Sequence, residues 1–279
     1  MKVFEEKELE KIYKPQDIGK GGNGQVTIIG GSSLFHGAPL LALKVASRVV
    51  DMVFFTSPEP SLNEIVTKMK SQVGSFIWFP FNQVDEYIKK CDAILIGPGL
   101  MRYHKKIKNS KLKIQNLDRA GLETKKITEK LLSEFPQKQW VIDAGSLQVI
   151  EKRFITKDAI LTPNQKEFKM LFGQQNPSQA AQENHCIIVY KNALTEVYSE
   201  QEEKLIKGGN NGLVKGGTGD VLAGLCTALV AKNPPFFSAC AASFIVKKAA
   251  DELYQKVGFA YNADDLAEKI PEVLGRYLK

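Results

Sequence analysis

Short apolar runs alternate with longer helical stretches along most of the chain. Six runs read as buried strands, at 25–31, 51–57, 92–99, 139–145, 158–164 and 185–191. Longer apolar stretches at 37–50, 221–232 and 236–257 predict helices. Continuous apolar strands separated by helices are typical of a parallel sheet that is covered on both faces. The pattern therefore predicts an α/β protein with a mostly parallel central sheet covered by helices on both faces.

Small or polar residues follow the predicted strands. The strand ends carry "GGS", "GPG", "DAG", "TPN" and "YKN". Ligands of open parallel sheets bind beyond the carboxyl ends of the strands. The same edge of the predicted sheet is therefore the expected binding edge.

The chain shows no internal repeat, no low-complexity tract and no linker. We therefore expect one domain over residues 21–279. It is preceded by a charged segment, residues 1–20, that could be mobile.

The composition is that of a folded globular protein. The chain has 279 residues, of which 43% are hydrophobic and 25% charged, so it can bury a large core. We find no signal peptide and no run of the roughly 20 apolar residues that span a bilayer. The four cysteines have no C-x-x-C spacing, and most border apolar runs as buried free thiols do. These features predict a cytoplasmic protein without a membrane partner.

The net charge of +7 admits an anionic partner, either nucleic acid or a phosphorylated small molecule. Much of the excess lies in residues 101–130, where Tyr103 is the single aromatic residue. Nucleic-acid surfaces combine basic with aromatic residues or a known module. A solvated basic face is therefore the favoured interpretation, and we expect no nucleic-acid partner.

The stretch "GGTGD", residues 216–220, precedes an apolar predicted helix. Consecutive glycines can aim successive N–H groups at one point, and a helix N-terminus adds its dipole there. Such a nest suits phosphoryl transfer, with Asp220 as the base that takes the proton of an attacking hydroxyl. The plainer alternative is that Asp220 caps the helix and the glycines form a turn. The P-loop pattern is absent.

Six segments, in order, resemble the ATP- or ADP-dependent NAD(P)H-hydrate dehydratases of the ribokinase-like superfamily. "KGGTGDVLAG" resembles the anion-hole motif of that superfamily. The other segments that carry the resemblance are "VTIIGGSSLFHGAPLLAL", "DAILIGPGL", "VIDAGSLQVI", "LTPNQKEFKMLFG" and "YNADDLAEKIPEVLG". Together they span about residues 25–275. The resemblance implies a ribokinase-like fold.

The resemblance also implies a lyase reaction of metabolite repair. Hydrated NADH or NADPH is phosphorylated on its ring hydroxyl by ATP or ADP with Mg²⁺, and loss of phosphate restores the dihydropyridine. Phosphate is a far better leaving group than hydroxide, and the ring nitrogen can expel it. The substrate and the nucleotide would be the partners, and by resemblance the chain could assemble as a homo-oligomer, a tetramer.

Matched position by position, the resemblance assigns Asp220 as the catalytic base and as a contact to the hydrated ring. It assigns the anion hole and the phosphate-binding stretch to Gly216, Gly217, Thr218 and Gly219, and to Lys191, Asn192, Ala193, Leu194 and Thr195. It assigns the dinucleotide contacts to Ala38, Gly99 and Asn164. No residue is assigned as a protein ligand of a metal.

Several of these residues also have structural interpretations. Lys191 alone could be a surface lysine, and Asn164 a turn residue after Pro163. Asp143, at a strand end, is either a functional candidate or a structural acid. Glu167 could orient a magnesium-bound water or simply begin a helix. The histidines at 36, 104 and 185 lack a matching ligand partner.

Four positions depart from the family pattern: Met101 and Asn192 stand for glycines, Gly145 for an aspartate and Asn164 for a histidine. Two alternatives therefore stay open. One is a small-molecule kinase of the same superfamily that acts on a vitamin-precursor alcohol. The other is a catalytically weak nucleotide-binding protein.

Overall fold

The computed structural model describes all residues except 70, 72–73, 103–113 and 193. Its strands form one sheet in the order β1-β10-β9-β8-β7-β6-β5-β2-β3-β4. They are β1 (Lys2–Val3), β2 (Gln25–Ile29), β3 (Met52–Thr56), β4 (Ile77–Trp78), β5 (Ala93–Ile96), β6 (Gln139–Ile142), β7 (Ile160–Leu161), β8 (Ile187–Lys191), β9 (Thr195–Tyr198) and β10 (Glu203–Ile206). Neighbouring strands are parallel except where β9 pairs with β8 and β10. The predicted sheet and its six strands are confirmed.

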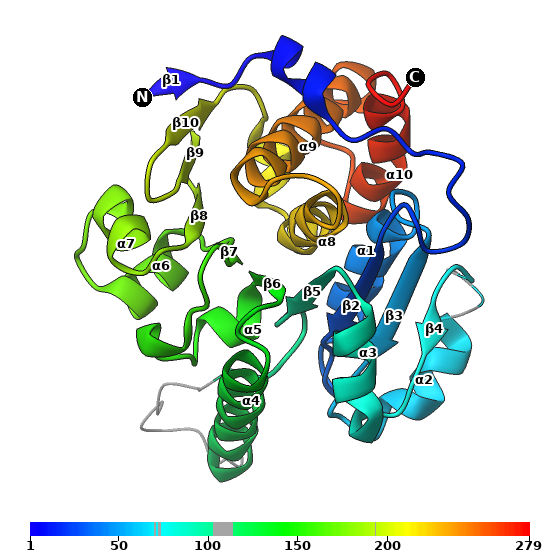
Figure 1. The fold of residues 1–279 in the computed structure, drawn as a ribbon, viewed down its shortest axis with the longest axis vertical. Helices are drawn as coiled ribbons and strands as arrows, with labels where there is room; N and C mark the ends of the chain where they lie inside the picture. The colour runs from blue at the N-terminus through cyan, green and yellow to red at the C-terminus, as the bar shows by residue number, and fades with distance from the viewer. Residues whose placement is uncertain (70, 72–73, 103–113, 193) are drawn as a thin grey trace.

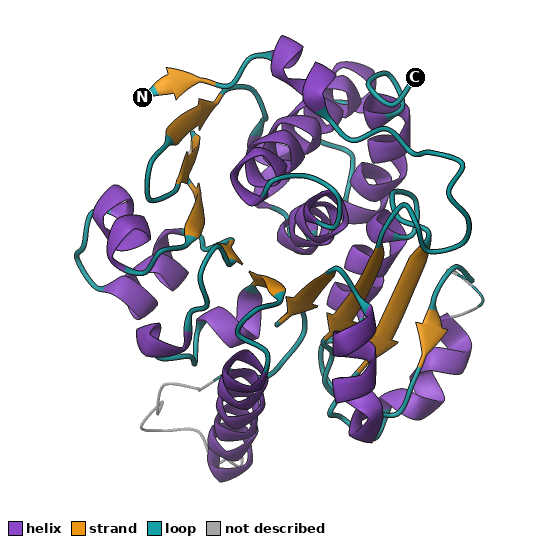
Figure 2. Ribbon diagram, viewed as in Figure 1, coloured by secondary structure: helices purple, strands orange, loops and turns teal. Residues whose placement is uncertain are grey.

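The helices cover the sheet on both faces (Figures 1 and 2). They are α1 (Gly37–Ala46), α2 (Leu62–Met69), α3 (Val84–Lys90), α4 (Ile114–Glu134), α5 (Ala144–Leu147), α6 (Gln165–Phe172), α7 (Pro177–Glu183), α8 (Thr218–Val230), α9 (Pro235–Val257) and α10 (Ala263–Leu274). Short 3₁₀ helices include η1 (Glu6–Lys11) and η4 (Asn211–Val214). The three helices predicted from the apolar pattern correspond to α1, α8 and α9.

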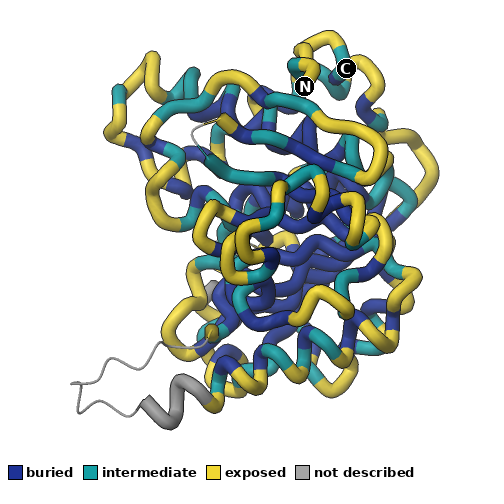
Figure 3. The backbone as a smooth tube through the Cα atoms, turned by 90° about the vertical axis from the view of Figure 1, so that its left-hand side faces the viewer, coloured by how far each residue is buried: buried dark blue, intermediate teal, exposed yellow. Residues whose placement is uncertain are grey.

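Alternate strand residues enter two separate cores. In β2, Ile28 packs with the side chains of α1, α8, α9 and α10, while Ile29 packs with those of α3 and α4. In β5, Leu95 belongs to the first core and Ile96 to the second. Because successive side chains of a strand point to opposite faces, a strand buried on both faces needs apolar residues at every position. Figure 3 shows this buried sheet between more exposed helices.

The N-terminal segment lies along α9 and α10 (Figure 1). Strand β1 adds to the edge of the sheet beside β10, and Phe4, Leu9 and Ile12 are buried in the core. Phe4 is in ring contact with Phe237 and Phe244 of α9. Residues 2–12 therefore share the core of residues 21–279, although mobility of this segment stays a prediction.

Among the described residues, no helix is both long and apolar enough to cross a membrane. All four cysteines are buried free thiols, as predicted.

Candidate functional site

The glycine loop forms the N-terminus of α8. Gly217 is the N-cap, and its φ of +92° is a backbone conformation that favours glycine. Asp220 is the third residue of the helix, and no side chain caps this N-terminus. The capping alternative for Asp220 is therefore wrong. The main-chain N–H of Thr218 donates to the oxygen of Lys215 at 3.4 Å, while those of Gly216, Gly217 and Gly219 remain available to an anion at the positive end of the helix dipole.

Three predicted strands deliver polar side chains to this loop. Asp143 follows β6, Asn164 follows β7 and Lys191 ends β8. The Lys191 Nζ lies 3.5 Å from Oδ1 of Asp143. It would also lie 3.3 Å from a Cβ atom added at Gly219. The lysine ammonium therefore sits between the end of β6 and the glycine loop.

Asp143 is held deep in this site. Its side chain is 4% exposed and that of Lys191 is 23% exposed. The hydroxyl of Thr162, at the end of β7, donates to Oδ1 of Asp143 at 2.6 Å. The sequence left open whether Asp143 is functional or structural. In the structure it lies beside Lys191, within a group of charged side chains.

Four charged groups interact in the site. Burial, with Asp143 and Glu167 adding to it, raises the pKa of Asp220 to about 7, while Lys191 opposes this rise. Burial and Asp143 also raise the pKa of Glu167 above its usual range. Burial alone would lower the pKa of Lys191, but the nearby carboxylates of Asp143, Glu167 and Asp220 raise it. A carboxyl that titrates near neutrality can accept a proton under ordinary conditions.

Asn164 and Glu167 form the start of α6. The Asn164 side chain accepts from the main-chain N–H groups of Lys166 and Glu167, at 2.9 and 3.0 Å. The Glu167 carboxylate accepts in return from the N–H of Asn164, which completes a capping box. It also accepts from the side-chain amide of Gln148 at 3.0 Å. The Asn164 oxygen is thus engaged in the cap, and its amide N–H₂ group is the part that is left to donate to a ligand.

The stretch 191–195 is the turn between β8 and β9. Lys191 pairs with Thr195 across this hairpin. The Asn192 oxygen accepts from the N–H of Leu194 at 2.7 Å, an Asx turn that gives the departure at Asn192 a structural reason. Thr195 is buried and Leu194 is exposed, and Ala193 lies outside the described residues. Lys191 is the member of this stretch that the structure shows against the glycine loop.

Ala38 and Gly99 lie in the segments that follow the neighbouring strands β2 and β5. A Cβ atom at Gly99 would lie 2.2 Å from the main-chain oxygen of Phe35, so the two loops are in close contact. Ala38 is the second residue of α1, and Leu41 of that helix packs against Gly217. The predicted dinucleotide residues therefore share the edge of the sheet with the glycine loop.

The other departures from the family pattern, Gly145 and Met101, and the histidines at 36 and 185 lie in different surroundings. A Cβ atom at Gly145 would lie 2.2 Å from the main-chain oxygen of Leu100, so a longer residue has no room there. Met101 is half-buried. His36 precedes α1, and His185 pairs with Glu200 at 3.1 Å. His104 and most of the first half of the basic segment 101–130 lie outside the described residues.

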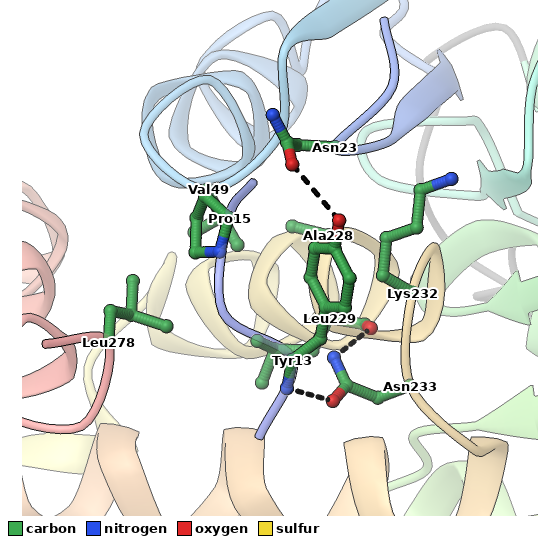
Figure 4. A pocket seen from close by; sticks show the side chains of 9 residues that line it. All are labelled: Tyr13, Pro15, Asn23, Val49, Ala228, Leu229, Lys232, Asn233 and Leu278. Carbon is green, nitrogen blue, oxygen red and sulfur yellow. Dashed lines mark hydrogen bonds between the residues drawn. The ribbon is translucent and has the colours of Figure 1, made fainter. Parts of the chain in front are cut away.

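The pocket in Figure 4 lies away from the candidate site. It is lined by Ala228 and Leu229 near the C-terminus of α8, whereas Asp220 lies at the N-terminus of that helix. Tyr13, Asn23 and Asn233 close it with hydrogen bonds to one another and to the main chain. This pocket contains none of the candidate site residues.

A family model described as NAD(P)H-hydrate dehydratase matches residues 26–272. The bifunctional NAD(P)H-hydrate repair enzyme Nnr of Methanocaldococcus jannaschii is 34% identical over 267 residues, 91% of this chain and 49% of the relative. The chain spans about half the length of this relative and of the Nnr enzymes of Archaeoglobus fulgidus and Hyperthermus butylicus.

Solved structures have the same fold. A ribokinase-like superfamily protein from Enterococcus faecalis superposes with a TM-score of 0.78 at 20% identity, over 99% of this chain and 96% of that one. An ADP/ATP-dependent NAD(P)H-hydrate dehydratase from Bacillus subtilis, co-crystallised with ATP and Mg²⁺, gives 0.74 at 22% identity, over 99% and 98%. The predicted ribokinase-like fold is confirmed.

Proposed function

Because this chain belongs to the NAD(P)H-hydrate dehydratase family, we propose that it dehydrates hydrated NADH or NADPH at the expense of ATP or ADP. The observation that carries the proposal is that Asp220, Lys191 and the glycine loop meet at the carboxyl edge of the sheet. A relative of this chain is named for the repair of NAD(P)H hydrate. The small-molecule kinase and the weak nucleotide-binding protein remain as outcomes of the test.

The reaction proceeds by phosphoryl transfer and elimination. Asp220 accepts the proton of the ring hydroxyl while the oxygen of that hydroxyl attacks the terminal phosphorus of the nucleotide. The bond from that phosphorus to the nucleotide breaks, and the shortened nucleotide leaves. The ring C–O bond then breaks as the nitrogen lone pair expels inorganic phosphate. Loss of a neighbouring ring C–H proton restores the dihydropyridine.

The glycine loop and Lys191 stabilise the phosphoryl group. The free main-chain N–H groups of Gly216, Gly217 and Gly219 face the developing charge, and the positive end of the α8 dipole adds to them. The Lys191 ammonium lies against the same loop and exchanges part of its interaction with Asp143 for the phosphate oxygens. Asn192, Leu194 and Thr195 shape the phosphate-binding turn from which Lys191 extends.

The residues present fit Mg²⁺. No group of three or more His, Cys, Asp or Glu side chains among the described residues could hold a metal ion by itself. Mg²⁺ usually takes one or two carboxylates together with phosphates and water. Asp143 and Glu167 offer buried oxygen ligands beside Lys191, and they are the residues that would hold Mg²⁺. The ion would neutralise charge on the nucleotide phosphates.

The dinucleotide lies over Ala38, Gly99 and Asn164. These positions follow β2, β5 and β7, at the carboxyl edge of the sheet that also carries Lys191. The Asn164 amide N–H₂ group donates to the substrate, because its oxygen is engaged in the α6 cap. We further propose that residues 21–279 form the dehydratase domain. The buried free thiols support a cytoplasmic location, and we propose a homo-oligomeric assembly.

The test is incubation of the protein with hydrated NADH or NADPH, Mg²⁺ and either nucleotide. The proposal expects the reduced-nicotinamide absorbance to return, with one inorganic phosphate released per molecule restored. A stable phosphoester on another alcohol substrate, without restored absorbance, would indicate the kinase. Nucleotide binding with no turnover would indicate the weak binding protein.

A further inference from the structure

Lys215 stands immediately before the glycine loop, where a basic residue is expected to face the phosphates. Its ammonium instead donates to the main-chain oxygens of Phe259 and Tyr261, at 2.5 and 2.6 Å. The same Nζ lies 5.5 Å from the centroid of the Tyr261 ring. These acceptors belong to the connection between α9 and α10, residues 258–262, which we call the clasp. The charge lies close to the negative end of the α9 dipole, which favours a cation there.

A second set of contacts fastens the chain just before Lys215 to the same clasp. Tyr261 is 2% exposed, and its hydroxyl donates to the Asn210 side-chain oxygen at 2.7 Å. That oxygen also accepts from the N–H of Gly212 at 3.0 Å and so caps η4. A Cβ atom at Gly212 would lie 2.1 Å from the Tyr261 hydroxyl, so the ring packs directly on this backbone.

The base of this network is in α9. Asp251 accepts from the N–H of Gly209 at 2.8 Å and from the Asn210 amide at 3.1 Å. Lys247 donates to the main-chain oxygens of Ile206 and Gly208. The far end of the loop is fixed as well, because a Cβ atom at Gly217 would lie 2.8 Å from that of Ala263, the first residue of α10. The segment 208–217 is thus fastened along its length to α9, the clasp and α10.

We propose that Lys215 is a positioning residue, whose ammonium ties the glycine loop to the clasp and so sets the direction of the loop N–H groups toward the transferring phosphoryl group. Two of the three ammonium hydrogens are directed at main-chain oxygens, so this lysine acts through the loop and not as a phosphate ligand. Small displacements matter, because a misplacement of about 1 Å can reduce a rate by about 10²-fold.

The proposed role of Lys215 rests on the proposed function, because its effect on kcat is measured with hydrated NADH. The experiment therefore also includes readouts that do not need turnover. Lys215→Met is compared with Lys207→Met, a matched loss of charge at an exposed lysine eight residues earlier. The measurements are kcat with hydrated NADH, the Kd for the nucleotide by calorimetry, and amide hydrogen exchange over residues 208–219 without ligand.

The proposal expects Lys215→Met to reduce kcat by about 10-fold or more, with nucleotide Kd changed by less than about 3-fold and faster exchange in the loop. Lys207→Met should match the unmodified protein in all three. In Lys215→Ala, added ammonium or methylammonium ions should restore part of kcat in a saturable way, which a merely structural loss would not show.

A nucleotide Kd raised about 10-fold with kcat kept would overturn the proposal and make Lys215 a phosphate ligand. Unchanged loop exchange together with unchanged kcat would overturn it as well. Should Lys215→Met fail to fold, Tyr261→Phe removes one fastening hydrogen bond and must show the same faster exchange. If the unmodified protein does not turn over hydrated NADH, the proposed function fails, while exchange and nucleotide binding still decide the role of Lys215.

Discussion

The two sides of the glycine loop are built on opposite principles. On the strand side, Asp143, Glu167, Lys191 and Asp220 crowd three carboxylates around one ammonium in a buried place. On the clasp side, Lys215, Tyr261, Asn210 and Asp251 form hydrogen bonds with main-chain atoms and with one another. The strand side destabilises the charged form of Asp220. The clasp side provides hydrogen-bond partners for its polar side chains.

This difference separates reactivity from rigidity. Burial, with the charges of Asp143 and Glu167 adding to it, raises the pKa of Asp220 into the range of a base at neutral pH, at a cost in folding free energy. A hydrogen bond of the kind found on the clasp side contributes about 0.5–1.5 kcal/mol each. The loop between them is therefore held in place from the side that has no role in proton transfer.

The largest effect is expected from removing the base. Asp220→Asn should lower kcat by about 10²-fold or more with nucleotide affinity largely kept, because the amide cannot accept the proton. Steady-state kinetics with hydrated NADH, combined with calorimetry of nucleotide binding, measure both effects. Unchanged kcat would remove Asp220 from the mechanism.

The loop backbone provides the next test. Gly217→Ala places a Cβ 2.6 Å from Leu41 Cδ1 at a residue with φ of +92°. Strain of about 1–3 kcal/mol should lower the melting temperature by several degrees and kcat by about 10-fold. Gly216→Ala is the matched control, because nothing lies within 4 Å of its added Cβ. Equal losses in both variants would contradict a fixed Gly217.

The burial of ionised Asp220 beside other carboxylates should lower the free energy of unfolding. Replacing Asp220 by a neutral residue should therefore stabilise the fold. The folded pKa of Asp220, about 7, lies above its usual 3.8. Its ionised form therefore destabilises the fold at high pH, and this penalty fades as the pH falls from 7 toward 4. Asp220→Asn should melt about 2 °C or more above the unmodified protein at pH 8 and show no advantage near pH 4. Denaturation at both pH values decides the sign.

The smallest effect is a shift of the pH profile. The charge of Asp143 adds to the raised pKa of Asp220, so Asp143→Asn should move the acidic limb of kcat/KM to lower pH. The profile is measured at saturating Mg²⁺, because the variant also loses a proposed Mg²⁺ ligand and its overall rate should fall. Thr162→Val, which removes a hydrogen bond to Asp143 but no charge, should leave the limb in place. A limb at the same pH in both variants would mean that Asp143 does not tune the base.

Much of the fold could be predicted from the sequence. Strands such as β2 and β5 are buried on both faces, so most of their positions are apolar, with Gln25 and Thr27 the polar residues of β2, and the pattern is visible without a structure. The edge strands β1 and β4, of two residues each, were missed because so short a run carries no period. Strands β9 (TEVY) and β10 (EKLI) were missed because each has four residues and includes charged ones, which leaves no apolar run long enough to recognise.

The site was predicted in part. Asp220, Lys191 and the glycines were selected from motif order, whereas Asp143 was left as an open alternative. A strand-end acid has the same local sequence whether it is structural or part of a charged cluster. Its importance depends on Lys191, 48 residues later, and on Thr162, 19 residues later.

Local patterns in the chain suffice to predict the sheet, its carboxyl edge and the glycine loop proposed to bind phosphate, because strand burial, glycine conformation and helix dipoles act over a few residues. The position of Lys215 needed the folded molecule. Its partners Phe259 and Tyr261 lie more than forty residues away and offer main-chain oxygens, which every residue has. No side-chain pattern marks such a contact, so only the structure shows that the lysine next to the glycine loop is bound to the clasp.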